Sequence, residues 1–200
     1  MKTLLSKIVL LTALLWLPLA AHAEKTILVL GDSLSAAYGI PREAGWVNLL
    51  QQELLGTPYR VVNASISGET TTGGLRRIGE ALRQHQPKIV IIELGANDGM
   101  RGAPIASIEA NLAGLMQQAR KARARVLLLG MQLPPNYGLT YTAEFKAMYP
   151  KLAQRHRAAL VPFFLEGIAP EQFQADNLHP VAQAQPIILQ NVMVKLKPLL

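Results

Sequence analysis

The chain has 200 residues, a formal net charge of +7 and no cysteine, and half of its residues are hydrophobic. This length suits one domain with a sizeable core. The lack of cysteine excludes disulfides, thiol catalysis and cysteine-based metal sites, so an exported form would be stable through its core alone.

The first 23 residues have the pattern of a secretory signal peptide. Lys2 and Lys7 supply a positive start, residues 8–21 form an uncharged and largely apolar run, and Ala21-His22-Ala23 fits a small-x-small cleavage site. The alternative is an N-terminal membrane anchor, but the apolar run is shorter than the roughly 20 residues that a span needs. We therefore predict a periplasmic protein cleaved after Ala23, with one domain over residues 24–200.

Five apolar runs of strand length recur along this domain, at Thr26–Leu30, Tyr59–Asn63, Lys88–Leu94, Arg125–Met131 and Ala159–Phe163. Segments with helical periodicity separate them, such as the apolar stripe from Ile105 to Met116, and a last helix is expected from about Ala184 to Lys195. Strands that alternate with helices indicate βαβ units. We predict an α/β, flavodoxin-like, three-layer fold with a five-stranded parallel sheet in the order 2-1-3-4-5.

The motif Gly31-Asp32-Ser33-Leu34-Ser35 follows the first predicted strand. Ligands of open α/β sheets bind outside the carboxyl ends of the strands, so Ser33 is a candidate nucleophile. The alternative is an ordinary turn, since glycine tolerates a positive φ and Asp and Ser bond to local backbone. A base and an oxyanion site elsewhere in the chain would decide for catalysis.

Two further motifs of small polar residues, 65–70 and 95–99, follow the second and third predicted strands. In a parallel sheet, all three motifs lie at the same edge. The backbone N–H groups of Ser33 and Gly68 and the side-chain amide of Asn97 could then stabilise an oxyanion. Taken singly, Gly68 and Asn97 also fit ordinary turn chemistry.

Histidine is the usual base near neutral pH, and only three histidines follow the predicted signal peptide. His85 and His156 precede the third and fifth strands, which places them at the wrong edge, and we interpret them as surface residues of connectors. His179 follows the fifth strand, and Asp176 could orient its imidazole and stabilise the protonated form. Pro180 restricts His179 to extended geometry. The alternative is a helix-capping aspartate beside an incidental surface histidine.

Ser33, Gly68, Asn97 and His179 occur in the order Ser, Gly, Asn, His, within Gly-Asp-Ser-Leu-Ser, Ser-Gly-Glu-Thr, Gly-Ala-Asn-Asp and Asp-Asn-Leu-His-Pro. This arrangement resembles the SGNH, or GDSL, hydrolase family, and its four blocks cover the predicted mature chain nearly end to end. Residues 132–138 (Gln-Leu-Pro-Pro-Asn-Tyr-Gly) further resemble the branch of small periplasmic enzymes described as acyl-CoA thioesterase I, protease I and lysophospholipase.

The resemblance implies a serine esterase that works through an acyl-enzyme intermediate. Ser33 would attack the carbonyl carbon, His179 would take its proton, and Asp176 would orient His179. The N–H groups of Ser33 and Gly68 and the Asn97 amide would form the oxyanion hole. The implied substrates are small acyl esters and thioesters, including acyl-CoA thioesters, lysophospholipids and aryl esters.

Four residues lie on loops near the expected pocket, namely Met100, Leu133, Pro134 and Tyr137. The last three belong to the irregular stretch 132–141, which follows the fourth strand and would overhang the catalytic edge. We predict that all four line an acyl-binding groove. The alternative for each of them is packing of the loop against the sheet.

We expect neither a cofactor nor a metal ion, because no group of histidines or carboxylates has ligand spacing. The densest basic run, residues 120–125, falls at the end of a predicted helix, where cations suit the helix dipole. It lacks interleaved aromatic residues, so we expect no nucleic-acid partner, and we expect a monomer without stable membrane insertion. Attraction to anionic substrates or membrane surfaces stays open.

Two other functions compete with the esterase. A non-catalytic periplasmic module that binds acyl or glycan ligands would keep the fold, but it would not need Ser33, His179 and Asp176 together. A phosphatase with Asp32 as nucleophile would need a second aspartate two positions on, where this chain has Leu34.

Overall fold

The computed structural model describes residues 24–200, so the predicted signal peptide lies outside the described residues. Its centre is a five-stranded parallel sheet in the order β2-β1-β3-β4-β5. The strands are β1 (Lys25–Gly31), β2 (Tyr59–Asn63), β3 (Ile89–Glu93), β4 (Arg125–Leu129) and β5 (Ala159–Val161). The predicted fold class and strand order are therefore confirmed.

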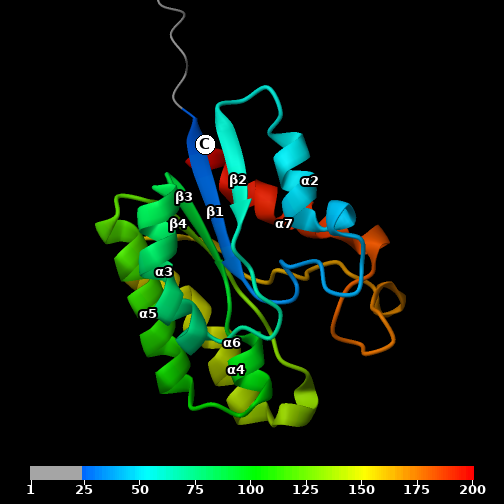
Figure 1. The fold of residues 1–200 in the computed structure, drawn as a ribbon. Coiled ribbons are helices and arrows are strands. Elements are labelled where there is room, and N and C mark those ends of the chain that lie inside the picture. Colours follow the sequence, from blue (N-terminus) through cyan, green and yellow to red (C-terminus); the bar gives the residue numbers. More distant parts are fainter. Residues whose placement is uncertain (1–23) are drawn as a thin grey trace, which may run out of the picture.

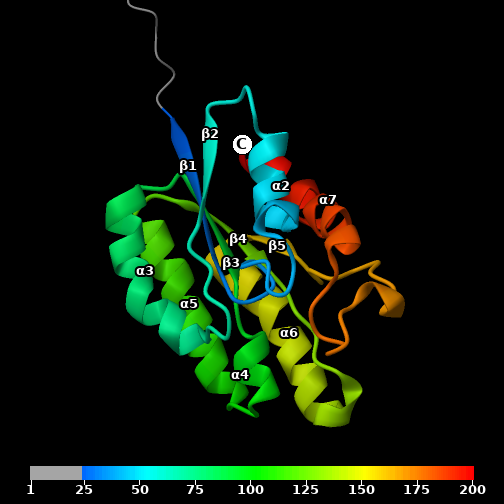
Figure 2. The same cartoon turned by 45° about the vertical axis from the view of Figure 1, so that its right-hand side comes forward.

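Helices cover both faces of the sheet (Figure 1). One layer contains α3, α5 and α6, and the other contains α2 and α7, as the turned view also shows (Figure 2). The helices are α2 (Trp46–Glu53), α3 (Thr71–His85), α4 (Ala96–Met100), α5 (Ile105–Lys121), α6 (Leu139–His156) and α7 (Gln185–Leu196). Short 3-10 turns lie at Arg42–Ala44, Pro135–Tyr137, Pro170–Gln172, Ala182–Ala184 and Lys197–Leu199.

The core forms around the two central strands. Residues 27–30 of β1 and 89–92 of β3 are fully buried, because helices cover these strands on both sides. Such strands read as continuous apolar runs rather than alternating ones. Trp46 of α2 meets Phe164 edge to face at 5.6 Å, which joins the second helical layer to the segment after β5.

Two segments differ from the sequence expectation. Met100, expected on a loop, is the last residue of the short helix α4 (Ala96–Met100). The irregular stretch expected over 132–141 contains a 3-10 turn and ends early, since α6 begins at Leu139. Within residues 24–200, no helix combines the length and the apolar character needed to cross a membrane.

The register of β1 and β3 brings the sequence motifs together. Gly31 pairs with Glu93, so the segments that follow both strands start side by side at the carboxyl edge. Ile66 after β2 reaches the same place, where its N–H donates to the Gly31 carbonyl at 3.1 Å. This catalytic edge of the sheet therefore collects residues from three strands.

Candidate active site

Ser33 and His179 meet at the catalytic edge although they are far apart in sequence. Ser33 Oγ lies 2.8 Å from His179 Nε2, and His179 Nδ1 lies 2.7 Å from Asp176 Oδ2. An ionised carboxylate can only accept a hydrogen bond, so Nδ1 carries a proton and donates it to Asp176. Nε2 is then free to accept the hydroxyl proton of Ser33. This is the geometry that a serine nucleophile with an oriented base requires.

The loop that carries His179 is built around the Asp176 carboxylate. Asp176 Oδ1 accepts backbone N–H bonds from Leu178 at 2.9 Å and His179 at 3.0 Å. The His179 N–H bond is the main cause that lowers the pKa of Asp176 to about 2, so this carboxylate is ionised at neutral pH. Asn177, with φ of 55°, provides the left-handed turn between them.

Gln174 ties this loop to the nucleophile loop. Its Nε2 donates to the carbonyl of Tyr38 at 2.9 Å, and its backbone N–H donates to the carbonyl of His179 at 2.8 Å. The Tyr38 ring lies 4.6 Å from the His179 ring, centroid to centroid. Contacts from both sides therefore limit how far His179 can move away from Ser33.

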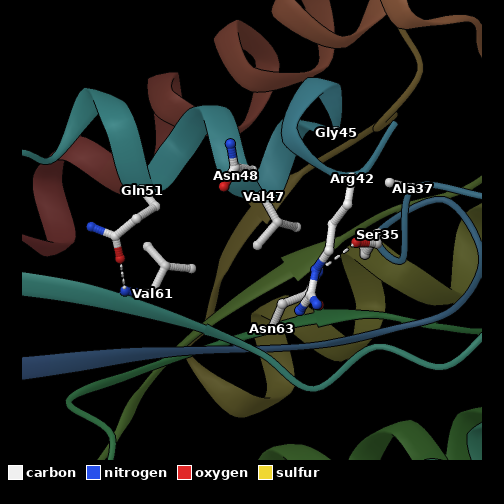
Figure 3. Close-up of a pocket in the computed structure, with 9 residues that line it drawn as sticks. All are labelled: Ser35, Ala37, Arg42, Gly45, Val47, Asn48, Gln51, Val61 and Asn63. Carbon is white, nitrogen blue, oxygen red and sulfur yellow. Dashed lines mark hydrogen bonds between the residues drawn. The ribbon is translucent and has the colours of Figure 1, made fainter. Parts of the chain in front are cut away.

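The nucleophile loop is also supported from the side of α2 and β2. Asn63 Nδ2 donates to the carbonyl of Ser35 at 2.8 Å, and Gln51 Oε1 accepts from the N–H of Val61 at 2.7 Å (Figure 3). A small cavity of about 130 Å³ lies between these elements, lined by Ser35 but not by Ser33. We interpret this region as support for the loop.

The three predicted oxyanion donors belong to the segments after β1, β2 and β3 at one edge of the sheet, but they are not equally available. Within the described residues, the backbone N–H groups of Ser33 and Gly68 donate to no protein acceptor. Gly68 has φ of 77°, a left-handed conformation that favours glycine. Asn97 Nδ2, in contrast, already donates to Asp32 Oδ2 and to the carbonyl of Glu69, both at 3.0 Å.

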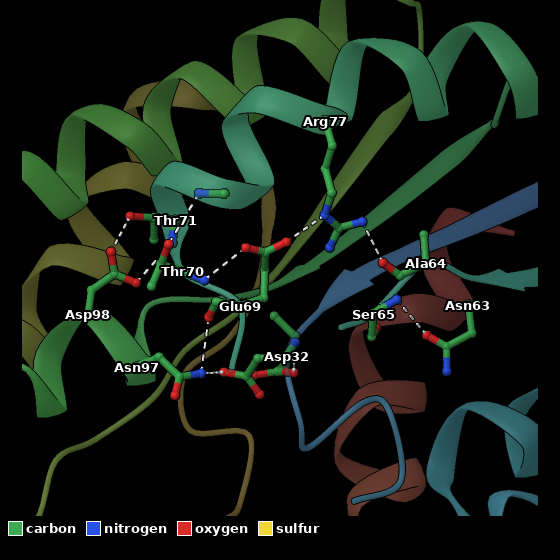
Figure 4. A network of polar contacts seen from close by, with 12 residues as sticks. Asp32, Asn63, Ala64, Ser65, Glu69, Thr70, Thr71, Arg77, Asn97 and Asp98 are labelled. Atoms are coloured by element: carbon green, nitrogen blue, oxygen red, sulfur yellow. Dashed lines mark hydrogen bonds and ion pairs between the residues drawn. The ribbon is translucent and has the colours of Figure 1, made fainter. Parts of the chain in front are cut away.

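An ion pair holds the loop that carries Gly68 (Figure 4). Arg77 Nε of α3 lies 2.6 Å from Glu69 Oε2, and Arg77 Nη1 donates to the carbonyl of Ala64 at 2.6 Å. One arginine thus holds both ends of the segment 64–69. Asp98 of α4 caps the start of α3 through the N–H and hydroxyl of Thr71. This network fixes the Gly68 loop against the two helices.

Two carboxyl groups lie buried beneath the nucleophile turn. Glu93 Oε2 accepts from Ser35 Oγ at 2.7 Å and from the N–H of Asp32 at 3.2 Å, and Glu93 is completely buried. Burial raises the pKa of Glu93 well above its usual value, and the charge of Asp32 raises it further. Burial also raises the pKa of Asp32 to about 6. Both effects favour the protonated form of Glu93, so a neutral Glu93 beside an ionised Asp32 is the state that we infer for this pair.

A cavity of about 410 Å³ opens beside Ser33 and His179. Met100, Leu133 and Pro134 line it, at three of the positions named from the sequence. Tyr137, the fourth, is not in the wall of this cavity. It ends a 3-10 turn and packs, partly buried, against the core.

Sequence reasoning missed other apolar walls of the same cavity, formed by Leu34, Met131, Phe163, Leu165 and Phe173. Phe163 ends the fifth apolar run, so its place at the carboxyl edge was available as a signal. Phe173 comes from the segment between β5 and His179, which has no periodic pattern to place it. An apolar cavity beside a nucleophile suits an acyl chain.

The other two histidines lie away from the site. His85, the last residue of α3, lines a separate cavity at the amino ends of the strands. The expectation of a surface residue is wrong for His156, which is buried as the last residue of α6. Burial lowers the pKa of His156, with Arg155 and Arg120 adding to the effect. Within residues 24–200, no group of three or more His, Asp or Glu side chains could hold a metal ion.

The chain is similar in sequence and structure to known esterases and thioesterases. Residues 29–185 match the GDSL-like Lipase/Acylhydrolase family. The chain is 53% identical over 182 residues to Esterase TesA of Pseudomonas aeruginosa, covering 89% of this chain and 90% of that protein. It is 43% identical over 188 residues to Thioesterase 1/protease 1/lysophospholipase L1 of Escherichia coli K12, covering 93% and 90%.

A solved structure agrees with these sequence matches. The psychrotrophic esterase EstA from Pseudoalteromonas sp., in a form inhibited by monoethylphosphonate, is similar with a TM-score of 0.83 and 41% identity. The match covers 88% of this chain and 98% of that one.

We expect Arg77→Met to lower kcat about tenfold with little change in KM, because the Gly68 loop loses its anchor while the apolar stem of the side chain is kept. Steady-state hydrolysis of a soluble aryl ester measures both constants. Arg76→Met is the matched control, since Arg76 is an exposed neighbour on α3 without a hydrogen bond or ion pair among residues 24–200. Equal kcat values for the two variants would contradict the anchoring role.

Replacement of Glu93 tests its neutral state. In the unfolded chain Glu93 releases its proton near its ordinary pKa of 4.5, whereas in the folded protein its pKa is higher and the proton stays bound. The free energy of unfolding therefore falls as the pH rises above about 4.5. The raised pKa of Asp32 lowers the free energy of unfolding in the same direction as the pH rises from 3.8 to about 6. Glu93→Gln mimics the neutral acid, so its melting temperature should decline less than that of the wild type between about pH 5 and pH 8.

Glu93→Ala provides the contrast. It removes the acceptor for two hydrogen bonds and leaves a cavity, and we expect a loss of about 3 kcal/mol in the free energy of unfolding. Thermal unfolding followed by circular dichroism measures both variants. Parallel pH profiles of the wild type and Glu93→Gln would show that Glu93 is ionised in the folded state.

Proposed function

Since the chain belongs to the GDSL-like lipase/acylhydrolase family, we propose that it is a serine esterase that hydrolyses carboxylic esters and acyl thioesters. The observation that carries this proposal is the 2.8 Å contact between Ser33 Oγ and His179 Nε2, with Asp176 on the far side of the ring. The neighbouring apolar cavity gives an acyl chain a place to bind.

Acylation begins when Ser33 Oγ attacks the carbonyl carbon of the substrate and its proton moves to His179 Nε2. The resulting imidazolium is stabilised by Asp176, which stays ionised because its pKa is about 2. His179 then donates the proton to the departing alkoxide or thiolate as the tetrahedral intermediate collapses. The products are the free alcohol or thiol and an ester of Ser33.

Deacylation repeats the same steps with water. His179 takes a proton from a water molecule that attacks the acyl carbon, and it returns this proton to Ser33 Oγ as the carboxylic acid leaves. Two oxyanions form in one catalytic cycle, so the oxyanion donors act in both halves. Loss of one such donor typically lowers kcat by about 10²–10³.

In the proposed oxyanion hole, two donors have no protein acceptor and the third already donates hydrogen bonds to the protein. The N–H groups of Ser33 and Gly68 are free of protein acceptors within the described residues, whereas Asn97 donates to Asp32 and Glu69. Asn97 joins the hole by sharing or exchanging one of these bonds as the oxyanion forms. The Asp32 contact meanwhile keeps the amide oriented.

The substrate class follows from the cavity and the relatives. Most of the wall residues are apolar, and Gln132 is a polar but uncharged exception beside Leu133, so the cavity fits fatty acyl groups better than a strongly charged acyl part. The name of one relative includes thioesterase and lysophospholipase activities, and the names of others include esterase. We extend these substrate types, with aryl esters, to this chain.

We also propose that residues 1–23 form a signal peptide removed after Ala23, and that residues 24–200 act in the periplasm as one domain. The pattern of residues 1–23 supports this proposal. The described domain contains no cysteine, so its folding there depends on no disulfide.

Ser33→Ala should abolish hydrolysis of aryl esters, acyl-CoA and lysophospholipids, because the acyl-enzyme cannot form. A fluorophosphonate probe should label the wild type at Ser33 and fail to label the variant, as read by peptide mass spectrometry. Ser107→Ala, at an exposed serine of α5, is the control and should keep full activity and labelling. An unlabelled wild type would instead favour a module that only binds acyl ligands.

Leu133→Ala should shift the preference among acyl chains from C4 to C16 by about tenfold or more, because it enlarges the wall of the cavity. Tyr137→Ala should leave this preference within about twofold, since Tyr137 lies outside the wall. The ratio of kcat/KM values across a series of p-nitrophenyl esters measures the effect. A larger shift for Tyr137→Ala would place the acyl chain elsewhere.

A further inference from the structure

The edge of the sheet opposite the active site is strongly basic. Lys25, Arg60, Lys88 and Arg125 lie at the amino ends of four parallel strands, since Thr26 pairs with Arg60 and Ile89 pairs with Arg125. The Thr26 carbonyl accepts from the N–H of Lys88, and the Lys88 carbonyl accepts from the N–H of Arg125. In Figure 1 this edge is at the top, where β1 begins.

Two connecting turns add arginines to the same edge. Arg123 lies between α5 and β4, and Arg157 lies between α6 and β5. We call Lys25, Arg60, Lys88, Arg123, Arg125 and Arg157 the basic edge. All but the half-buried Lys25 are exposed, and among residues 24–200 only Arg60 of these six forms an ion pair, with Glu24 at 2.9 Å.

Helix dipoles explain only part of this charge. The last turns of α3, α5, α6 and α7 also contain cations, which favour the carbonyl end of a helix. Arg157 is the C-cap residue of α6 and Arg123 follows the C-cap residue of α5, so the dipole accounts for part of their placement. Lys25, Arg60 and Lys88 lie at or near the starts of strands, where no such reason applies. Arg123 and Arg157 even have φ of 62° and 49°, a left-handed conformation that costs a side-chain-bearing residue about 1 kcal/mol and that glycine adopts freely.

The basic edge surrounds a cavity suited to an anionic group. Arg60, His85, Lys88 and Arg123 line a space of about 480 Å³, and Glu24 is the one acidic residue in its wall. The carboxyl edge is mixed in charge, since Asp98 and Asp176 lie there together with Arg77 and Arg101. The basic edge is distinguished from it by six cations around a cavity with one acidic residue.

An exposed apolar side chain stands on the same edge. Leu55 lies in the turn between α2 and β2 and is 72% exposed. This turn projects beyond the amino ends of the strands (Figures 1 and 2). Aromatic side chains that would stack on unpaired bases are lacking here, since Tyr59 is buried. Cations around a projecting leucine match a lipid surface better than a nucleic acid.

We propose that the basic edge docks on an anionic phospholipid bilayer, with a headgroup phosphate in the cavity between Lys88 and Arg123 and with Leu55 inserted among the acyl chains. The choice of a bilayer over nucleic acid rests in part on the proposed export. The active site then faces away from the surface to which the protein is bound.

Vesicle flotation tests the proposal. The wild type should float with vesicles that contain phosphatidylglycerol at about 0.05 M salt, should be released at about 0.5 M salt, and should not float with phosphatidylcholine alone. Lys88→Glu with Arg123→Glu should lower the partition coefficient about 30-fold or more. Leu55→Ser should lower it about tenfold without any change of charge.

The matched control combines Arg76→Glu with Lys146→Glu, which changes the net charge equally through exposed cations away from the basic edge. Its binding should change less than about threefold. Hydrolysis of a soluble aryl ester at wild-type rates verifies that each variant is folded. The proposal is overturned if the wild type fails to bind anionic vesicles, if the control loses as much binding as the edge variant, or if duplex DNA binds more tightly than the vesicles.

Discussion

The catalytic edge depends on one buried contact beneath the nucleophile turn. Glu93 at the end of β3 accepts hydrogen bonds from the N–H of Asp32 and the hydroxyl of Ser35, which ties the turn after β1 to the neighbouring strand. The same contact requires glycine at position 31, because a Cβ there would lie 2.7 Å from both Glu93 Oε2 and Ser35 Oγ. Glu93 fixes residues 32 and 35 through these hydrogen bonds, and Ser33, which lies between them, lines the cavity of about 410 Å³.

Two adjacent buried carboxyl groups are costly, and the core has to offset this cost without disulfides. The residues that do so are the uninterrupted apolar runs of β1 and β3, with helices on both faces. Hydrogen bonds reduce the cost further, because the Asp32 carboxylate accepts from Leu34 and Asn97. The structure therefore places these two carboxyl groups next to its fully buried central strands.

The strand order could be predicted from the sequence because each strand is a separate apolar run between helical segments. Ser33 and His179 could be predicted because parallel topology assigns every connector to one edge or the other. The role of Glu93 could not be predicted, since a single acidic residue within an apolar run gives no signal apart from that of the buried strand. The double engagement of Asn97 and the place of Phe173 depend on loop geometry, which no local pattern determines.

Ser33 and His179, the proposed nucleophile and base, lie 146 positions apart in the chain. Ser33 follows the first strand, whereas His179 follows the last, so their contact depends on segments from both ends of the domain. Hydrolytic activity should therefore require that both ends of the domain are folded together. A chain that is kept unfolded until it has crossed a membrane would have no esterase activity in the compartment where it is made. Acyl thioesters in that compartment would therefore not be hydrolysed by it.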